Sequence, residues 1–126
     1  MTDGSILLVD DDFHIIQVLS LKLNNAKFQV RTASNGEEAL ERIEESVPDL
    51  LITDYSMPVM TGMELVKAVR AREDTMDLPI IMLTARGQTV EESDEPAPRI
   101  DLLMSKPFSP REILRNVQAL LEKVKP

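Results

Sequence analysis

Four short apolar runs in the sequence each lead into residues that can handle phosphate or a hard metal ion. Asp10 and Asp11 follow the first run, and a lone carboxylate, Asp54, follows the second. Thr84 offers a hydroxyl after the third run, and Lys106 offers an ammonium group after the fourth. Short apolar runs of this kind are typical of parallel strands buried on both faces. Residues just past the carboxyl ends of such strands gather where α/β proteins bind ligands, so we expect a single site.

Three carboxylates gathered in one pocket need a cation, because like charges at close range are unfavourable and raise one another's pKa. The sequence contains no cysteine and a single histidine, so the ligands on offer are oxygen atoms and the cation should be hard. Mg²⁺ fits best, since it accepts one or two carboxylates and bridges to phosphate oxygens. With Thr84 and Lys106 beside it, Asp54 has the surroundings that phosphoryl transfer to an aspartate requires.

The elements that must position these residues alternate between strand-like and helix-like patterns along the chain. The predicted strands cover residues 6–9, 28–32, 49–53, 80–83 and 102–104. Helical patterns follow the first three and the last of them, and two helices begin with capping-box sequences at Thr61 and Ser109. We expect Asp12 in the acidic first turn of the first helix. Strands alternating with helices predict a doubly wound α/β fold, a (βα)5 three-layer sandwich with a parallel sheet.

The connection between the fourth and fifth predicted strands, the fourth crossover, does not show the helical pattern of the others. Residues 87–99 carry four acids and few apolar side chains, and Pro96 and Pro98 would interrupt a regular helix. We expect a short helix at best, followed by a mobile extended segment. The fourth crossover is therefore predicted to be short or irregular.

Length and charge narrow the class of protein. A chain of 126 residues is typical of one domain, here residues 1–126. Its net charge of −8 argues against direct nucleic-acid binding, which needs clustered Lys or Arg. No apolar stretch approaches the roughly 20 residues of a membrane span, and the polar amino terminus is unlike a secretory signal. We therefore expect a cytoplasmic protein without membrane association.

Over nearly its whole length the chain resembles the receiver domain of two-component response regulators. The matching elements, in the family's order and spacing, are Leu7–Asp11, Asp54–Pro58 with Gly62, Leu83–Ala85 and Lys106–Phe108. The resemblance implies a five-stranded sheet of flavodoxin-like order 2-1-3-4-5.

By this resemblance Asp54 is the phosphoacceptor, and Thr84 and Lys106 contact the phosphoryl group. The implied metal site for Mg²⁺ consists of Asp10, Asp11, Asp54 and the backbone carbonyl of Ser56. The family also implies a cis peptide bond before Pro107, which is physically admissible because cis bonds are a proline phenomenon.

The resemblance also implies partners for a phosphorelay. A histidine kinase or phosphotransfer protein would donate to Asp54, docking near Ile15 and Val18 beside the Pro107–Phe108 loop. A downstream effector protein, which the sequence does not identify, would read the altered conformation. The chain would catalyse its own phosphorylation and dephosphorylation without being a metabolic enzyme.

Two departures from the family favour a second hypothesis. Three positions before Lys106 the family usually carries an aromatic switch residue, and this chain has Leu103, which has no polar tip. The irregular segment 87–99 replaces a regular helix. Both are compatible with a receiver-like interaction module that works independently of phosphorylation.

A third hypothesis is a phosphatase of the haloacid-dehalogenase type, because Asp10 and Asp12 form an Asp-x-Asp motif after a strand. That class needs further acids after the lysine to hold Mg²⁺. The only acids after Lys106 are Glu112 and Glu122, both in the last predicted helix.

Overall fold

Five strands and four helices follow one another in the part of the chain that the computed structural model describes, residues 4–85 and 98–124. The strands are β1 (Ser5–Val9), β2 (Gln29–Ala33), β3 (Leu50–Asp54), β4 (Ile80–Thr84) and β5 (Leu102–Ser105). The helices are α1 (Phe13–Asn25), α2 (Gly36–Glu45), α3 (Gly62–Arg70) and α4 (Pro110–Val124). None of these helices is long and apolar enough to cross a membrane.

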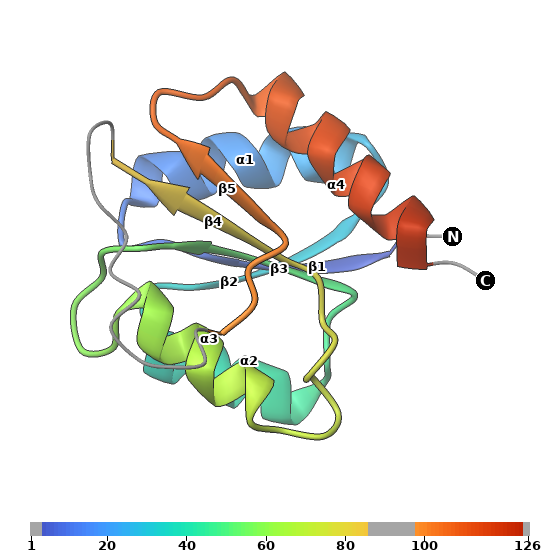
Figure 1. Cartoon of the computed structure of the whole chain (residues 1–126). Helices are drawn as coiled ribbons and strands as arrows, with labels where there is room; N and C mark the ends of the chain where they lie inside the picture. Colours follow the sequence, from blue (N-terminus) through green and yellow to red (C-terminus); the bar gives the residue numbers. More distant parts are fainter. Residues whose placement is uncertain (1–3, 86–97, 125–126) are drawn as a thin grey trace.

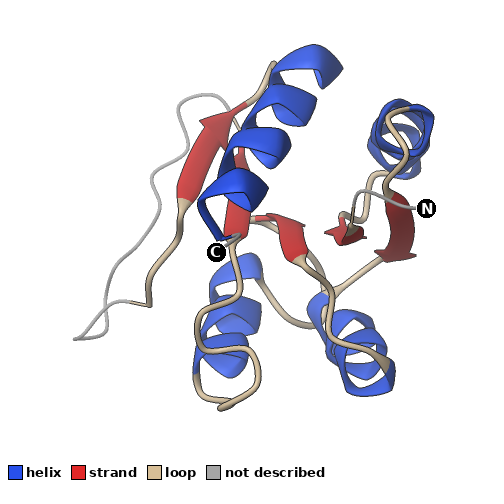
Figure 2. Ribbon diagram, turned by 90° about the vertical axis from the view of Figure 1, so that its right-hand side faces the viewer, coloured by secondary structure: helices blue, strands red, loops and turns tan. Residues whose placement is uncertain are grey.

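The strands form one parallel sheet in the order β2-β1-β3-β4-β5, as the resemblance implies. Helices α1 and α4 cover one face, and α2 and α3 cover the other, which gives three layers (Figures 1 and 2). The strand order reverses between β1 and β3, where Val9 is in register with Thr53. Asp10 and Asp54 therefore leave neighbouring strands at the same level, at the switch point where doubly wound proteins bind ligands.

Apolar side chains pack on both faces of the three central strands, which are almost completely buried. Leu7 and Leu51 point toward α2 and α3, whereas Leu8 and Ile52 point toward α1 and α4. Successive side chains of a strand alternate between faces, so each central strand is held from both sides. This packing fixes the strand ends that carry the polar residues.

The edge strand β5 differs from the prediction that every apolar run is buried on both faces. Leu102 and Met104 are half-buried against the core beside α1 and α4, but Leu103 points to the other face and is 51% exposed. Strand β5 pairs only with β4 in the described part of the chain. An apolar run at a sheet edge reads the same in the sequence as one at the centre, so the sequence could not show this exposure.

Arg70 of α3 anchors the beginning of β5. Its guanidinium group donates to the backbone carbonyls of Leu78, at 2.7 Å, and Arg99, at 3.1 Å. It also pairs at 3.2 Å with Asp101, whose carboxylate accepts a hydrogen bond from the backbone N–H of Ile80. The chain therefore enters β5 tied to both α3 and β4. The prediction for residues 87–99 lies outside the described residues, apart from Pro98 and Arg99, which are neither helix nor strand.

Polar side chains begin the helices. Asp12 is the N-cap of α1, where its carboxylate accepts hydrogen bonds from the backbone N–H groups of His14 and Ile15, so the expected place in the first turn was wrong by one position. The predicted capping box at Thr61 is present. Ser109 accepts a hydrogen bond from the backbone of Glu112 at 3.0 Å.

Candidate functional site

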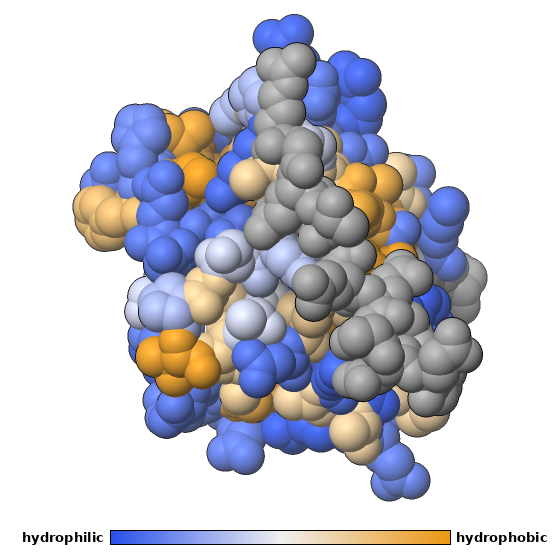
Figure 3. Space-filling view, turned by 60° about the vertical axis from the view of Figure 1, so that its left-hand side comes forward, coloured by the Kyte–Doolittle hydropathy of each residue, from blue (hydrophilic) through white to orange (hydrophobic). Residues whose placement is uncertain are grey.

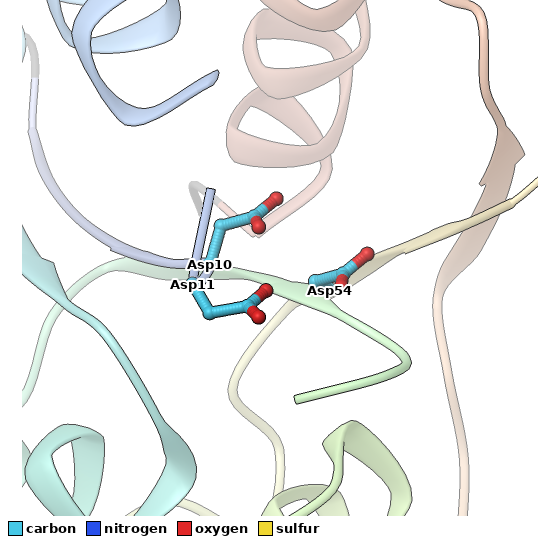
Figure 4. Close-up of side chains that lie close together, drawn as sticks. All are labelled: Asp10, Asp11 and Asp54. Carbon is cyan, nitrogen blue, oxygen red and sulfur yellow. The ribbon is translucent and has the colours of Figure 1, made fainter. Parts of the chain in front are cut away.

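Three carboxylates meet where β1 and β3 end. Figure 4 shows Asp10 and Asp11, just past β1, and Asp54, the last residue of β3, close together, and one oxygen atom of each lies within 4.8 Å of the others. Asp10 and Asp54 are only 1% and 5% exposed, whereas Asp11 is exposed. The structure therefore brings the three predicted acids into one partly buried pocket.

The chain holds Asp10 from two sides and leaves one of its carboxylate oxygen atoms without a hydrogen bond. Its backbone N–H donates to the carbonyl of Ala33, and its Oδ1 accepts a hydrogen bond from the backbone N–H of Asp12 at 2.9 Å. Its Oδ2 is buried and has no hydrogen-bond partner. Burial raises the pKa of Asp10 to about 6, and the neighbouring charge of Asp54 adds to the effect.

Lys106 places its ammonium group against the acids. Its Nζ lies 3.0 Å from Asp54 Oδ1 and 3.7 Å from Asp10 Oδ2. Burial raises the pKa of Asp54, although the hydrogen bond from Lys106 opposes that effect. Burial alone would lower the pKa of Lys106, but the hydrogen bond to Asp54 and the two negative charges outweigh it, so this pKa is raised. The peptide bond between Lys106 and Pro107 is cis, as the resemblance implies.

Thr84 ends β4 next to this pocket. It is 4% exposed, and its hydroxyl donates to the backbone carbonyl of Met104 at 3.4 Å. The backbone N–H of Lys106 donates in turn to the carbonyl of Thr84 at 2.7 Å, which ties the lysine to the same strand end. Ser56 lies exposed in the loop two residues after Asp54. The predicted hydroxyl and ammonium group therefore come from adjacent strand ends.

The structure explains why a glycine stands at position 62, which the motif alone did not. It begins α3, and its backbone N–H donates to the carbonyl of Tyr55 at 2.8 Å. A Cβ atom at this position would lie 2.3 Å from the backbone carbonyl oxygen of Asp54. Only glycine allows α3 to start so close to the strand end that carries the central carboxylate.

The donor set fits a hard divalent cation. Three carboxylates converge and two of them are buried. Among the described residues, only Lys106 forms an ion pair with them, and it carries a single positive charge. The buried Oδ2 of Asp10, which lacks a hydrogen bond, is an atom that a metal ion or its water would satisfy. Oxygen ligands of this kind suit Mg²⁺ better than softer metals.

An apolar groove adjoins the pocket. It has a volume of about 250 Å³ and is lined by His14, Ile15, Val18, Leu19, Lys106, Pro107, Phe108 and Pro110. The groove thus joins Ile15 and Val18 of α1, the docking residues that the resemblance implies, to the Pro107–Phe108 loop after β5. Figure 3 shows the end of the molecule where the strands finish, and its visible surface is mostly hydrophilic, with apolar residues in separate patches.

Comparison with known proteins gives a consistent result. The family model for the response regulator receiver domain matches residues 6–118. The phosphate regulon transcriptional regulatory protein PhoB of Rhizobium meliloti is 40% identical over 121 residues, which are 96% of this chain and 53% of that protein. The alkaline phosphatase synthesis transcriptional regulatory protein PhoP of Bacillus subtilis is 38% identical over 94% of this chain and 48% of its own length. The chain thus spans about half the length of these curated relatives.

Comparison with solved structures also finds response regulators. The chemotaxis response regulator CheY4 of Vibrio cholerae superposes with a TM-score of 0.84 and 38% identity, covering 94% of this chain and 99% of that one. The family match, the strand order and the pocket of three acids lead to one conclusion. The chain belongs to the receiver domains of two-component response regulators.

Proposed function

We propose that the chain accepts a phosphoryl group on Asp54, in a Mg²⁺-dependent reaction, from a histidine kinase or phosphotransfer protein. Phosphorylation then changes its interaction with a downstream effector protein. The observation that carries this proposal is the contact of 3.0 Å between Lys106 Nζ and Asp54 Oδ1 inside a pocket of three acids. Direct nucleic-acid binding is not part of the proposal, because the net charge is −8.

The metal ligands in this proposal are the carboxylates of Asp10, Asp11 and Asp54 and the backbone carbonyl of Ser56. When bound, Mg²⁺ supplies positive charge that offsets the negative charge on the phosphoryl oxygens. The buried carboxylate of Asp10 has one oxygen atom, Oδ2, that accepts no hydrogen bond. A bound cation would therefore also offset the negative charge of this buried carboxylate.

Asp54 is the nucleophile. One of its carboxylate oxygens forms the bond to phosphorus, while the bond between phosphorus and the donor's imidazole nitrogen breaks. The electron pair of that bond stays on the nitrogen, which takes up a proton. Lys106 stabilises the charge on the phosphoryl oxygens from its position beside the carboxylate. Thr84 supplies a hydroxyl donor from the next strand end, and attack of water on phosphorus later returns Asp54 and inorganic phosphate.

The groove along α1 is the proposed docking surface for the phosphodonor. Ile15 and Val18 face it from α1, and Pro107 and Phe108 face it from the loop after β5. Lys106 lines the same groove and also contacts Asp54, so a partner seated there reaches the phosphorylation pocket directly. An apolar groove beside a reactive group suits a helix that carries the donor histidine.

The test is phosphorylation of the chain by acetyl phosphate with and without Mg²⁺, followed by intact mass spectrometry. We expect one phosphoryl group on the wild type with Mg²⁺, and none on Asp54→Asn. Asp77→Asn is the matched control, because Asp77 is an exposed carboxylate that precedes the start of β4, at the opposite end of that strand from Thr84, and its removal should leave phosphorylation intact.

The same experiment tests the alternative, an interaction module that works independently of phosphorylation. The exposed Leu103, which cannot act as an aromatic switch, favours this alternative. Wild-type protein that gains no phosphate, or gains it without any change in its NMR spectrum, would contradict the proposed function and support the alternative.

A further inference from the structure

The contacts around β5 offer a path out of the pocket that does not use Leu103. Side chains alternate along β5, so Leu103 lies on the face away from α4, whereas Met104 packs in the core beside α1 and α4. Leu103 is half-exposed and has no polar atom that could exchange hydrogen bonds with Thr84. A signal that enters β5 through Met104 would therefore travel toward α4.

Met104 is the residue that Thr84 contacts. The hydroxyl of Thr84 donates to the Met104 carbonyl, and the following N–H, that of Lys106, donates back to the Thr84 carbonyl. These two hydrogen bonds add to the pairing of β4 with β5, which places Thr84 in register with Ser105. Movement of the Thr84 hydroxyl toward a phosphoryl group on Asp54 would break the first of these bonds and keep the second.

Asn116 extends the same contact to α4. Its side-chain amide donates to Met104 Sδ at 3.4 Å, from a half-buried position next to the fully buried Val117. A thioether is a weak acceptor, so the bond is easily exchanged. Met104 therefore contacts Thr84 through its carbonyl and Asn116 through its sulfur, so this single residue joins the end of β4 to the last helix.

We propose that Met104 and Asn116 couple the phosphorylation pocket to α4, so that the last helix, and not the Leu103 face, reports the state of Asp54. The proposal rests on the proposed function, because it requires a phosphoryl group on Asp54. Loss of the Thr84 bond removes one hydrogen bond to the Met104 carbonyl and lets β5 shift against α4. That shift breaks the weak bond between Asn116 and Met104 and so changes the surroundings of the helix. Both contacts belong to the unphosphorylated chain and stabilise it.

Thermodynamic linkage fixes the direction of the effect. An interaction present only in the unphosphorylated state opposes activation, so its removal must favour the activated state by the same factor. Each contact is weak, and we therefore expect Asn116→Leu and Met104→Leu to tighten the binding of a phosphoryl mimic about two- to five-fold. Met104→Leu keeps apolar volume in the core and removes the sulfur, whereas Asn116→Leu replaces the amide by an apolar side chain with the same branching.

The experiment titrates beryllofluoride with Mg²⁺ into the full chain and follows fluorine signals and backbone amide shifts. In the wild type we expect shifts in the pocket and in α4 around Asn116. In Asn116→Leu and Met104→Leu the pocket shifts should persist, while the α4 shifts fall to less than half. Leu103→Ala is the matched control, and it should leave both sets of shifts unchanged.

Three outcomes would overturn the coupling while leaving the proposed function intact: wild-type α4 shifts in both variants, loss of those shifts in Leu103→Ala, or a wild type whose shifts stay in the pocket. Absence of any fluorine signal or pocket shift in the wild type would instead overturn the proposed function, and the coupling with it. Thermal unfolding of each variant shows that it is folded, and either Asn116→Leu or Met104→Leu suffices for the test.

Discussion

The pocket at β1 and β3 and the strand end at β4 and β5 are built in opposite ways. The pocket buries charged groups at short range, with Lys106 3.0 Å from Asp54 and an oxygen of Asp10 that has no hydrogen bond. The other region joins uncharged groups by weak bonds of 3.4 Å, from Thr84 to Met104 and from Asn116 to Met104. Strong fixed charges suit a reaction that must always find the same geometry, and weak exchangeable bonds suit a part that must change.

Removing the positive charge from the pocket should have the largest effect. We expect Lys106→Met to slow phosphorylation of Asp54 by acetyl phosphate about 10²-fold or more, because the charge beside the phosphoryl oxygens is lost. Phosphorylated protein is measured over time by intact mass spectrometry. Lys123→Met, which removes an exposed lysine from the last turn of α4, should keep the wild-type rate. Equal phosphorylation rates in the two variants would show that phosphorylation of Asp54 does not depend on the positive charge of Lys106.

A methyl group at Gly62 tests how tightly the backbone around the pocket is packed. Its Cβ would lie 2.3 Å from the Asp54 carbonyl oxygen, so we expect Gly62→Ala to lower the free energy of unfolding by about 3 kcal/mol, measured by urea denaturation. Gly36→Ala is the comparison, since its Cβ would lie 2.7–2.9 Å from three atoms of the Met60 side chain, and a side chain can move more easily than the backbone carbonyl at Gly62. We expect that variant to lose less unfolding free energy than Gly62→Ala. Similar losses of unfolding free energy in the two variants would mean that the backbone at the end of β3 can move to make room for a methyl group.

The sequence predicted most of this pocket because its chemistry is carried by residue types at strand ends. Asp10 directly follows one apolar run, and Asp54 ends another. In a parallel sheet, residues at these positions must lie at the same edge of the sheet. The exposure of Leu103 was not predictable, because it depends on which strand lies at the edge and not on the local sequence. The bond between Asn116 and Met104 also gave no signal, since an asparagine in an amphipathic helix reads as part of the solvated face.

The energetic cost of burying the charged carboxylate of Asp10 should be measurable without any phosphodonor. In metal-free buffer near pH 8 we expect Asp10→Asn to raise the free energy of unfolding by on the order of 2–3 kcal/mol, because it removes a buried carboxylate whose pKa is raised to about 6. The asparagine oxygen can still accept the hydrogen bond from Asp12.

The sign of the pH dependence follows from the same shift. Folding raises the pKa of Asp10 from 3.8 to about 6, so the wild type loses stability as the pH rises through this range. The advantage of Asp10→Asn should therefore shrink by about half near pH 5. Added Mg²⁺ should stabilise the wild type more than the variant. An advantage that does not change with pH would show that the carboxylate charge is not its cause.

Truncation of Leu103 should have the smallest effect, and it tests whether the edge of the sheet is as loosely built as the structure indicates. Leu103 is 51% exposed, whereas its partner in register, Met82, is completely buried. We expect Leu103→Ala to cost less than about 1 kcal/mol of unfolding free energy and Met82→Ala about 2–5 kcal/mol, both measured by urea denaturation. A loss above about 2 kcal/mol for Leu103→Ala would mean that this face is packed in solution. The contrast between a rigid pocket and an adjustable edge would then fail, because both sides of β5 would be equally fixed.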